Sequence, residues 1–124
     1  MRTINNVKFV YLYRDASNYK AWGEVIFDNT DNLVLYEIEE RLRRSLDGGE
    51  YFLANQVCIP EVFLFQKDIF TEDDHYYHEF HCVEYTSNQC TDFYGRSIKT
   101  FVEQVEHVGW YDWPLDMRVK GPIP

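Results

Sequence analysis

The 124-residue chain has the length of one domain with one hydrophobic core, so we treat residues 1–124 as a single domain. Its net charge of -9 excludes broad contact with a nucleic-acid backbone, and its 45% apolar fraction excludes a disordered chain. Because no apolar run could span a membrane and the N-terminus lacks a secretory signal core, we predict a cytoplasmic protein with no membrane contact and reduced cysteines.

The first part of the chain predicts a β-hairpin. Residues 7–14 are rich in β-branched and aromatic side chains and show the alternation typical of a strand. Residues 15–18 (DASN) are turn formers, and residues 19–27 predict the returning strand. Residues 28–32 then break the strand and offer several side chains that can cap a helix.

The clearest helix is predicted over residues 33–46. Its apolar stripe recurs at helical spacing and consists of Leu35, Ile38, Leu42 and Leu46. Glutamates near the start and arginines near the end suit the helix dipole. The pair Gly48–Gly49 predicts the end of this helix.

The second half of the chain predicts two further strands and a second helix. Residues 61–65 (EVFLF) predict a strand, and residues 75–86 predict the longest strand. The second helix is predicted over residues 97–108, with Gly109 as its stop. The order strand, strand, helix, strand, strand, helix (ββαββα) predicts an α+β fold. We expect an antiparallel sheet of about four to five strands with two helices packed on one face.

Three histidines on the longest predicted strand suggest a metal site. Because strand side chains alternate between faces, His75 and His81 point one way and His78 points the other. Three ligands do not converge from that arrangement without a bulge, so we expect neither a metal nor a cofactor. Cys82 and His81 also lie on opposite faces, and no local catalytic motif occurs. We therefore predict a protein that is not an enzyme.

Arginines are the candidate anion contacts of this acidic chain. We expect Arg41 and Arg44 to pair with Glu37 and Glu40, one turn away on the first helix. Arg96 begins the second helix, where free backbone N–H groups also attract an anion, and Arg118 lies in the tail. A guanidinium grips a phosphate with two parallel hydrogen bonds.

Aromatic rings are the other prominent feature, with ten Tyr, nine Phe and three Trp. By strand alternation, Phe80 and His78 share a face with Cys82 and Glu84. If that face is open, the Phe80 ring is a platform on which a base can stack. Two interpretations of the aromatic segment 110–113 stay open: it caps a pocket or subunit contact, or it packs over the core.

Three stretches of the chain stand out: VKFVYLYRDASNYKAWGEVIFDN, LYEIEERLRRSL and HEFHCVEYT. They are followed by a helix and an aromatic tail, and together they span most of the chain. In this layout the chain resembles phage anti-Thoeris proteins, small sponges that sequester glycocyclic ADP-ribose. The resemblance implies a homo-oligomer that binds an intact cyclic nucleotide at a subunit interface. The candidate contacts are Phe80 for stacking, Arg96 and Arg118 for phosphates, and Asn88 for the base or ribose.

Two alternative functions stay open. The first is an acidic inhibitor or immunity protein whose carboxylates at Glu72, Asp73 and Asp74 mask a basic site on a nuclease or defence protein. The second is an enzyme that acts on a small nucleotide and uses the histidines as acid–base groups. Binding that weakens sharply with salt would favour the inhibitor, and a chemically altered ligand would favour the enzyme.

Overall fold

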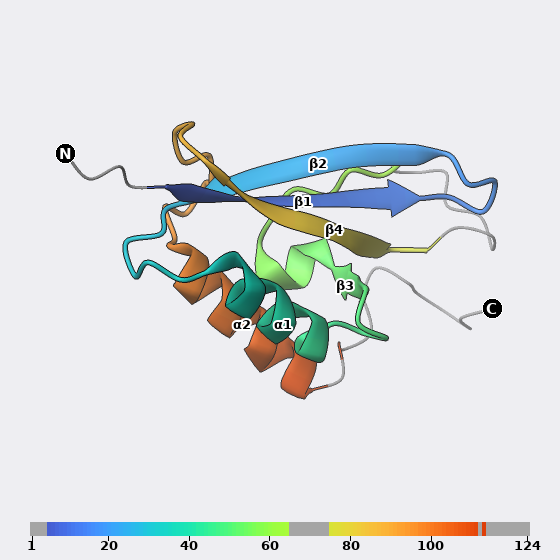
Figure 1. Cartoon of the computed structure of the whole chain (residues 1–124). Helices are drawn as coiled ribbons and strands as arrows, with labels where there is room; N and C mark the ends of the chain where they lie inside the picture. The colour runs from blue at the N-terminus through green and yellow to red at the C-terminus, as the bar shows by residue number, and fades with distance from the viewer. Residues whose placement is uncertain (1–4, 65–74, 112, 114–124) are drawn as a thin grey trace.

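The computed structural model describes residues 5–64, 75–111 and 113 of the chain. They form an antiparallel four-stranded sheet with two α-helices lying side by side against one face (Figure 1). The elements are β1 (Asn6–Arg14), β2 (Lys20–Phe27), α1 (Leu35–Ser45), β3 (Tyr51–Leu53), a 3-10 helix η1 (Ala54–Val57), β4 (Tyr77–Thr86) and α2 (Ile98–Trp110). The strand order is β2-β1-β4-β3. The predicted α+β class is confirmed with four strands, and a fifth strand is absent from the described residues.

The third strand is not the predicted one. Residues 61–64 are in no strand, residue 65 lies outside the described residues, and the third strand is instead the three-residue β3. The Tyr11 hydroxyl donates to the Pro60 carbonyl at 2.6 Å, and the Val62 amide donates to Nε2 of His78 at 3.0 Å. The apolar segment after Pro60 is therefore held by side chains rather than by a strand ladder, which periodicity alone does not reveal.

A β-bulge in β4 changes which side chains share a face. Tyr11 lies opposite Phe80, but Phe9, two residues away in β1, lies opposite Val83, three residues from Phe80. The extra residue moves Val83 onto the covered face with Phe80. The predicted grouping of Phe80 and His78 with Cys82 and Glu84 is therefore wrong, because strict alternation does not continue through a bulge.

The core lies between the sheet and the two helices. Phe9 is at its centre, with ring centroids 5.0–5.7 Å from those of four other rings: Tyr11, Phe52, Phe80 and Phe101. The helices contribute the apolar faces that their spacing predicts, with Ile38 and Leu42 from α1 and Phe101 from α2 all fully buried. One core cluster therefore contains residues from both helices and all four strands.

Gly109 does not end α2 as predicted, because the helix continues to Trp110. The absence of a side chain at Gly109 allows α2 to approach α1 closely. A Cβ atom at this position would lie 2.3 Å from the Ser45 carbonyl oxygen, which is a backbone atom that cannot rotate away. The indole N–H of Trp113 donates a hydrogen bond to the same Ser45 carbonyl oxygen at 2.7 Å.

The Gly109→Ala substitution should therefore be destabilising. In an ordinary helix interior, alanine is favoured over glycine by roughly 0.8–1.0 kcal/mol. Here we expect the clash to reverse the sign and lower the free energy of unfolding by about 1–3 kcal/mol. Urea denaturation measures the change, with Lys99→Ala on an exposed part of α2 as the control. A stabilised Gly109→Ala protein would show that the helices do not approach this closely.

Candidate functional site

Phe80 is not on an open face. Its side chain is 5% exposed, its ring stacks on Phe9 with centroids 5.4 Å apart, and the Arg43 guanidinium lies 4.8 Å from its centroid. The expectation of an exposed stacking platform at Phe80 is wrong, since the ring lies in the core on the face of the sheet that the helices cover. A ligand base does not reach it without displacing that packing.

Arg96 is occupied by contacts within the chain. Its guanidinium donates to both carboxylate oxygens of Asp92, at 3.0 and 2.9 Å, and to the carbonyls of Val57 and Cys58 at 2.9 Å. It also donates to the Gln104 side chain at 2.8 Å. The Asp92 and Arg96 side chains are 2% and 9% exposed. Burial raises the pKa of Asp92, but the hydrogen bonds from Arg96 outweigh it and hold that pKa below its usual value.

The structure does not assemble the predicted set of contacts. Asn88 is exposed in the loop after β4, where its carbonyl accepts from the Asn6 side chain at 2.8 Å. No hydrogen bond or ring contact joins Asn88 to Phe80 or Arg96 in the part of the chain that is described. Arg118 lies outside the described residues.

His81 lies apart from the other two histidines of this stretch. His75 and His78 both contact the Tyr13 ring, with ring centroids 4.9 and 5.5 Å from it. His78 is buried, and its ring nitrogens contact the Val62 amide at 3.0 Å and the Tyr76 carbonyl at 3.2 Å. His81 is exposed, and its ring lies edge-on to Trp22 at 5.0 Å. Among the described residues, no group of three His, Cys, Asp or Glu side chains is placed to hold a metal ion.

The cysteine on the same strand is poorly nucleophilic. Burial raises the pKa of the Cys82 thiol, and the carboxylates of Glu84 and Glu39 raise it further. A thiol with a raised pKa stays protonated near neutral pH, whereas the thiolate is the nucleophile.

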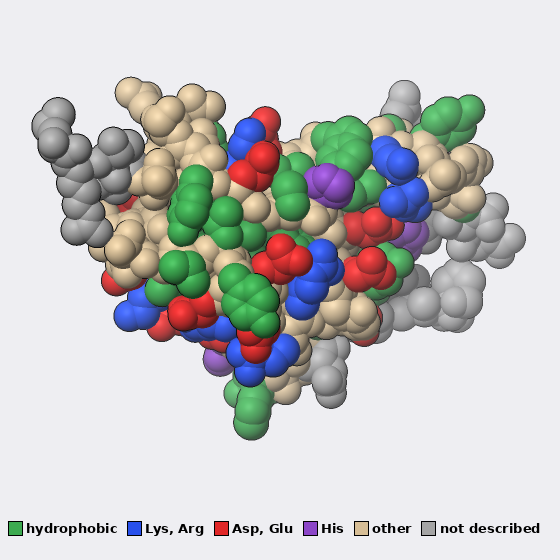
Figure 2. All heavy atoms as spheres, in the orientation of Figure 1, with side chains coloured by type: hydrophobic (Ala, Val, Ile, Leu, Met, Phe, Trp, Pro, Cys, Tyr) green, Lys and Arg blue, Asp and Glu red, His purple; other side chains and the backbone are tan. Residues whose placement is uncertain are grey.

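A strip along the exposed side of α1 forms a concave surface that carries rings and cations. We call it the Arg44 groove, and it has two adjoining hollows. One, of about 450 Å³, is lined by Tyr36, Glu39, Glu40, Arg43 and Arg44. The other, of about 420 Å³, is lined by Arg41, Arg44, Ser45, Glu106, Gly109 and Trp110. Arg44 lines both hollows, and Figure 2 shows charged side chains of both signs gathered over this side of the helices.

The arginines of this groove differ in how firmly they are held. Arg41 donates twice to Glu106 of α2, at 2.9 and 2.7 Å, and this hydrogen bonding raises its pKa. The predicted one-turn pairs are confirmed, Arg41 with Glu37 at 3.8 Å and Arg44 with Glu40 at 3.5 Å. The Arg44 side chain is 70% exposed, so its guanidinium is the most accessible cation of the groove.

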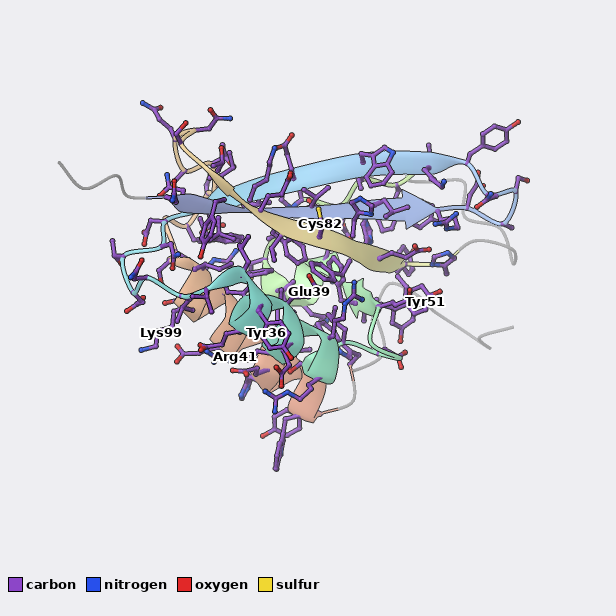
Figure 3. The ribbon with its side chains drawn as sticks, in the orientation of Figure 1. Tyr36, Glu39, Arg41, Tyr51, Cys82 and Lys99 are labelled. Atoms are coloured by element: carbon purple, nitrogen blue, oxygen red, sulfur yellow. The ribbon has the colours of Figure 1, made fainter. Side chains whose placement is uncertain are left out.

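Two exposed rings flank this cation. Tyr36 is 78% exposed and projects from α1 in Figure 3, and Trp110 is 83% exposed at the end of α2. For Trp113, which is 4% exposed, the interpretation that segment 110–113 packs over the core is confirmed. Trp110 lines a hollow, and the interpretation that it caps a pocket or a subunit contact stays a prediction. Sequence reasoning missed Tyr36, although its place off the apolar stripe of α1 indicates an exposed ring.

Comparison of the chain with known proteins found no relative. No protein-family model matches the chain, and no curated protein or solved structure was found to be similar to it. None of the described helices is long and apolar enough to cross a membrane.

Proposed function

We propose that the protein is a non-catalytic sponge that sequesters a cyclic nucleotide of the ADP-ribose type and so blocks a bacterial anti-phage defence. The observation that carries the proposal is the Arg44 groove, where one accessible guanidinium lines two hollows and each hollow has an exposed ring. The resemblance to anti-Thoeris sponges supplies the ligand class, and the groove supplies the contact residues.

The groove offers groups for each part of such a ligand. The Arg44 guanidinium pairs with a phosphate through parallel hydrogen bonds. The rings of Tyr36 and Trp110 stack on a base, an interaction worth roughly 1–3 kcal/mol per base. The carboxylates of Glu39 and Glu40 accept hydrogen bonds from ribose hydroxyls. This combination of cation, rings and carboxylates fits a nucleotide better than a bare phosphate.

The ion pair between Arg44 and Glu40 does not prevent this binding. Both side chains are substantially exposed, and an exposed pair is typically worth only about 0.2–1 kcal/mol. A sponge needs nanomolar affinity, or about 12 kcal/mol. A phosphate that displaces Glu40 therefore loses little of that total.

Calorimetric titration with glycocyclic ADP-ribose, followed by heat denaturation and mass analysis of the released ligand, tests the proposal. We expect tight binding and an intact ligand. Because a hydrogen bond to a charged group contributes about 1.5–3 kcal/mol, Arg44→Ala should raise the Kd about tenfold or more. Lys99→Ala, which removes an exposed cation from α2, should leave the Kd unchanged.

Two results would contradict the proposal. Absence of binding to any ADP-ribose-derived or cyclic-dinucleotide messenger would turn attention to the acidic inhibitor, whose Glu72–Asp74 segment lies outside the described residues. Release of an altered ligand would favour the enzyme. Binding that Arg44→Ala leaves intact would keep the sponge but move its site away from the groove.

A further inference from the structure

The outer edge of β2 is largely unpaired in the described residues. At one end, Ile26 uses this edge: its carbonyl accepts from the Thr91 amide at 2.9 Å, and its amide donates to the Thr91 hydroxyl at 2.8 Å. Alternate residues of a strand present their backbone groups to the same edge. Lys20, Trp22 and Glu24 therefore face outward in the same way as Ile26, and no backbone hydrogen bond between described residues occupies them there. Figure 1 shows β2 at the margin of the sheet.

We propose that this edge binds a second copy of the chain, with the two β2 strands antiparallel and a two-fold axis at Trp22. In this register Trp22 lies opposite Trp22 of the partner subunit, and Lys20 lies opposite Glu24 of the partner subunit. A two-fold interface repeats each contact, so the Lys20 and Glu24 pairing occurs twice. The outward amides and carbonyls of Lys20, Trp22 and Glu24 then form hydrogen-bonded pairs across the axis.

The side chains on the sheet face away from the helices are complementary in this register. The Trp22 ring is 53% exposed and lies over the sheet against His81 of β4, with ring centroids 5.0 Å apart, so it leaves the outer edge of β2 uncovered. Lys20 has no ion pair with any described residue, and Glu24 has one with Lys8 at 3.6 Å. Charged residues on an edge strand usually oppose pairing, but here each cation meets an anion of the partner.

Neighbouring registers are less favourable. An axis at Glu24 places two carboxylates opposite each other, and like charges in that position destabilise a pair. It also requires the edge at Ile26, which Thr91 occupies. On either side of Trp22, Ala21 and Gly23 point to the opposite face and carry no large side chain that would meet the side chains of a second strand there. Gly23 itself is required by Tyr11, whose ring would lie 2.6 Å from a Cβ atom there.

Sedimentation velocity of the full-length protein over a range of concentrations tests the proposal. We expect a reversible dimer of twice the 15.0 kDa chain mass. Lys20→Glu and Glu24→Lys should each raise the dimer dissociation constant about tenfold or more, because two attractive pairs become repulsive. The double exchange should restore the dimer. Lys99→Glu makes the same change of charge on α2 and should have no effect.

Hydrogen exchange identifies the edge directly. The amides of Lys20, Trp22 and Glu24 should exchange more slowly at concentrations where the dimer forms. A protein that stays monomeric at about 100 micromolar, a concentration at which even weak association is detected, would overturn the proposal. A dimer that Lys20→Glu leaves intact would also overturn it. So would a dimer in which the β2 amides are not protected from exchange. Ligand titration is a separate readout, so failure of the dimer does not imply failure of the proposed sponge.

Discussion

Replacing Arg96 with methionine is expected to lower the free energy of unfolding by about 3–5 kcal/mol, because removal of one partner leaves the other charge buried and unpaired. Asp92, whose side chain is 2% exposed in the structure, would lose both guanidinium hydrogen bonds. The carbonyls of Val57 and Cys58 would also lose their donor. Arg96 thus ties the loop before α2 to the end of η1.

Urea denaturation monitored by circular dichroism measures this loss. Arg44→Met is the matched control, since it makes the same change at an exposed site and should alter stability by less than about 0.5 kcal/mol. The two variants distinguish a structural role from a binding role. Arg96→Met should lower the free energy of unfolding, and the Arg44 substitution should lower the affinity for the ligand. A stable Arg96→Met protein that no longer binds a nucleotide would instead make Arg96 a phosphate contact.

Phe80→Ala is expected to be equally destabilising, by about 3–5 kcal/mol, because truncation of a buried ring loses its transfer free energy and leaves a cavity. The ring lies 5.4 Å from Phe9 and under the Arg43 guanidinium, so the cavity would open where β4 meets α1. A domain of this size has a total stability of only about 5–15 kcal/mol. The variant should therefore melt at a markedly lower temperature.

Phe93→Ala serves as the control, since that ring is 90% exposed and its loss should change stability by less than about 0.5 kcal/mol. Titration of the folded Phe80→Ala protein with glycocyclic ADP-ribose, below its melting temperature, completes the test. We expect an unchanged Kd. Normal stability combined with lost binding would restore Phe80 as the stacking ring.

The two proposed surfaces belong to different parts of the molecule, so the groove proposed for the nucleotide does not lie at the proposed β2 interface, unlike the subunit-interface site that the resemblance implies. The Arg44 groove follows the helices, whereas the β2 edge is at the margin of the sheet (Figure 1). Lys20→Glu should therefore weaken the dimer without changing ligand affinity. Each surface can be tested while the other is left intact.

Local periodicity was sufficient to predict much of the fold. The alternation over residues 7–14 and 19–27 and the stripe from Leu35 to Leu46 correspond to β1, β2 and α1 within one or two residues. These patterns are reliable because each element must bury one continuous face. The one-turn pairs of Arg41 and Arg44 were predictable for a similar reason, since helix spacing alone brings the partners together.

Contacts between residues distant in sequence determined the features that local periodicity did not predict. The bulge in β4 depends on pairing with β1, and it places Val83 instead of Cys82 on the covered face with Phe80. Phe80 itself is a core ring because the helices pack against that face. Arg96 was predicted to face an anion at a helix start, but Val57 and Cys58, nearly forty residues earlier, supply carbonyl acceptors that local sequence does not reveal. The sequence by itself therefore determined the elements and their buried faces. Only the tertiary structure decided which rings and cations remain accessible, because that depends on what packs against them.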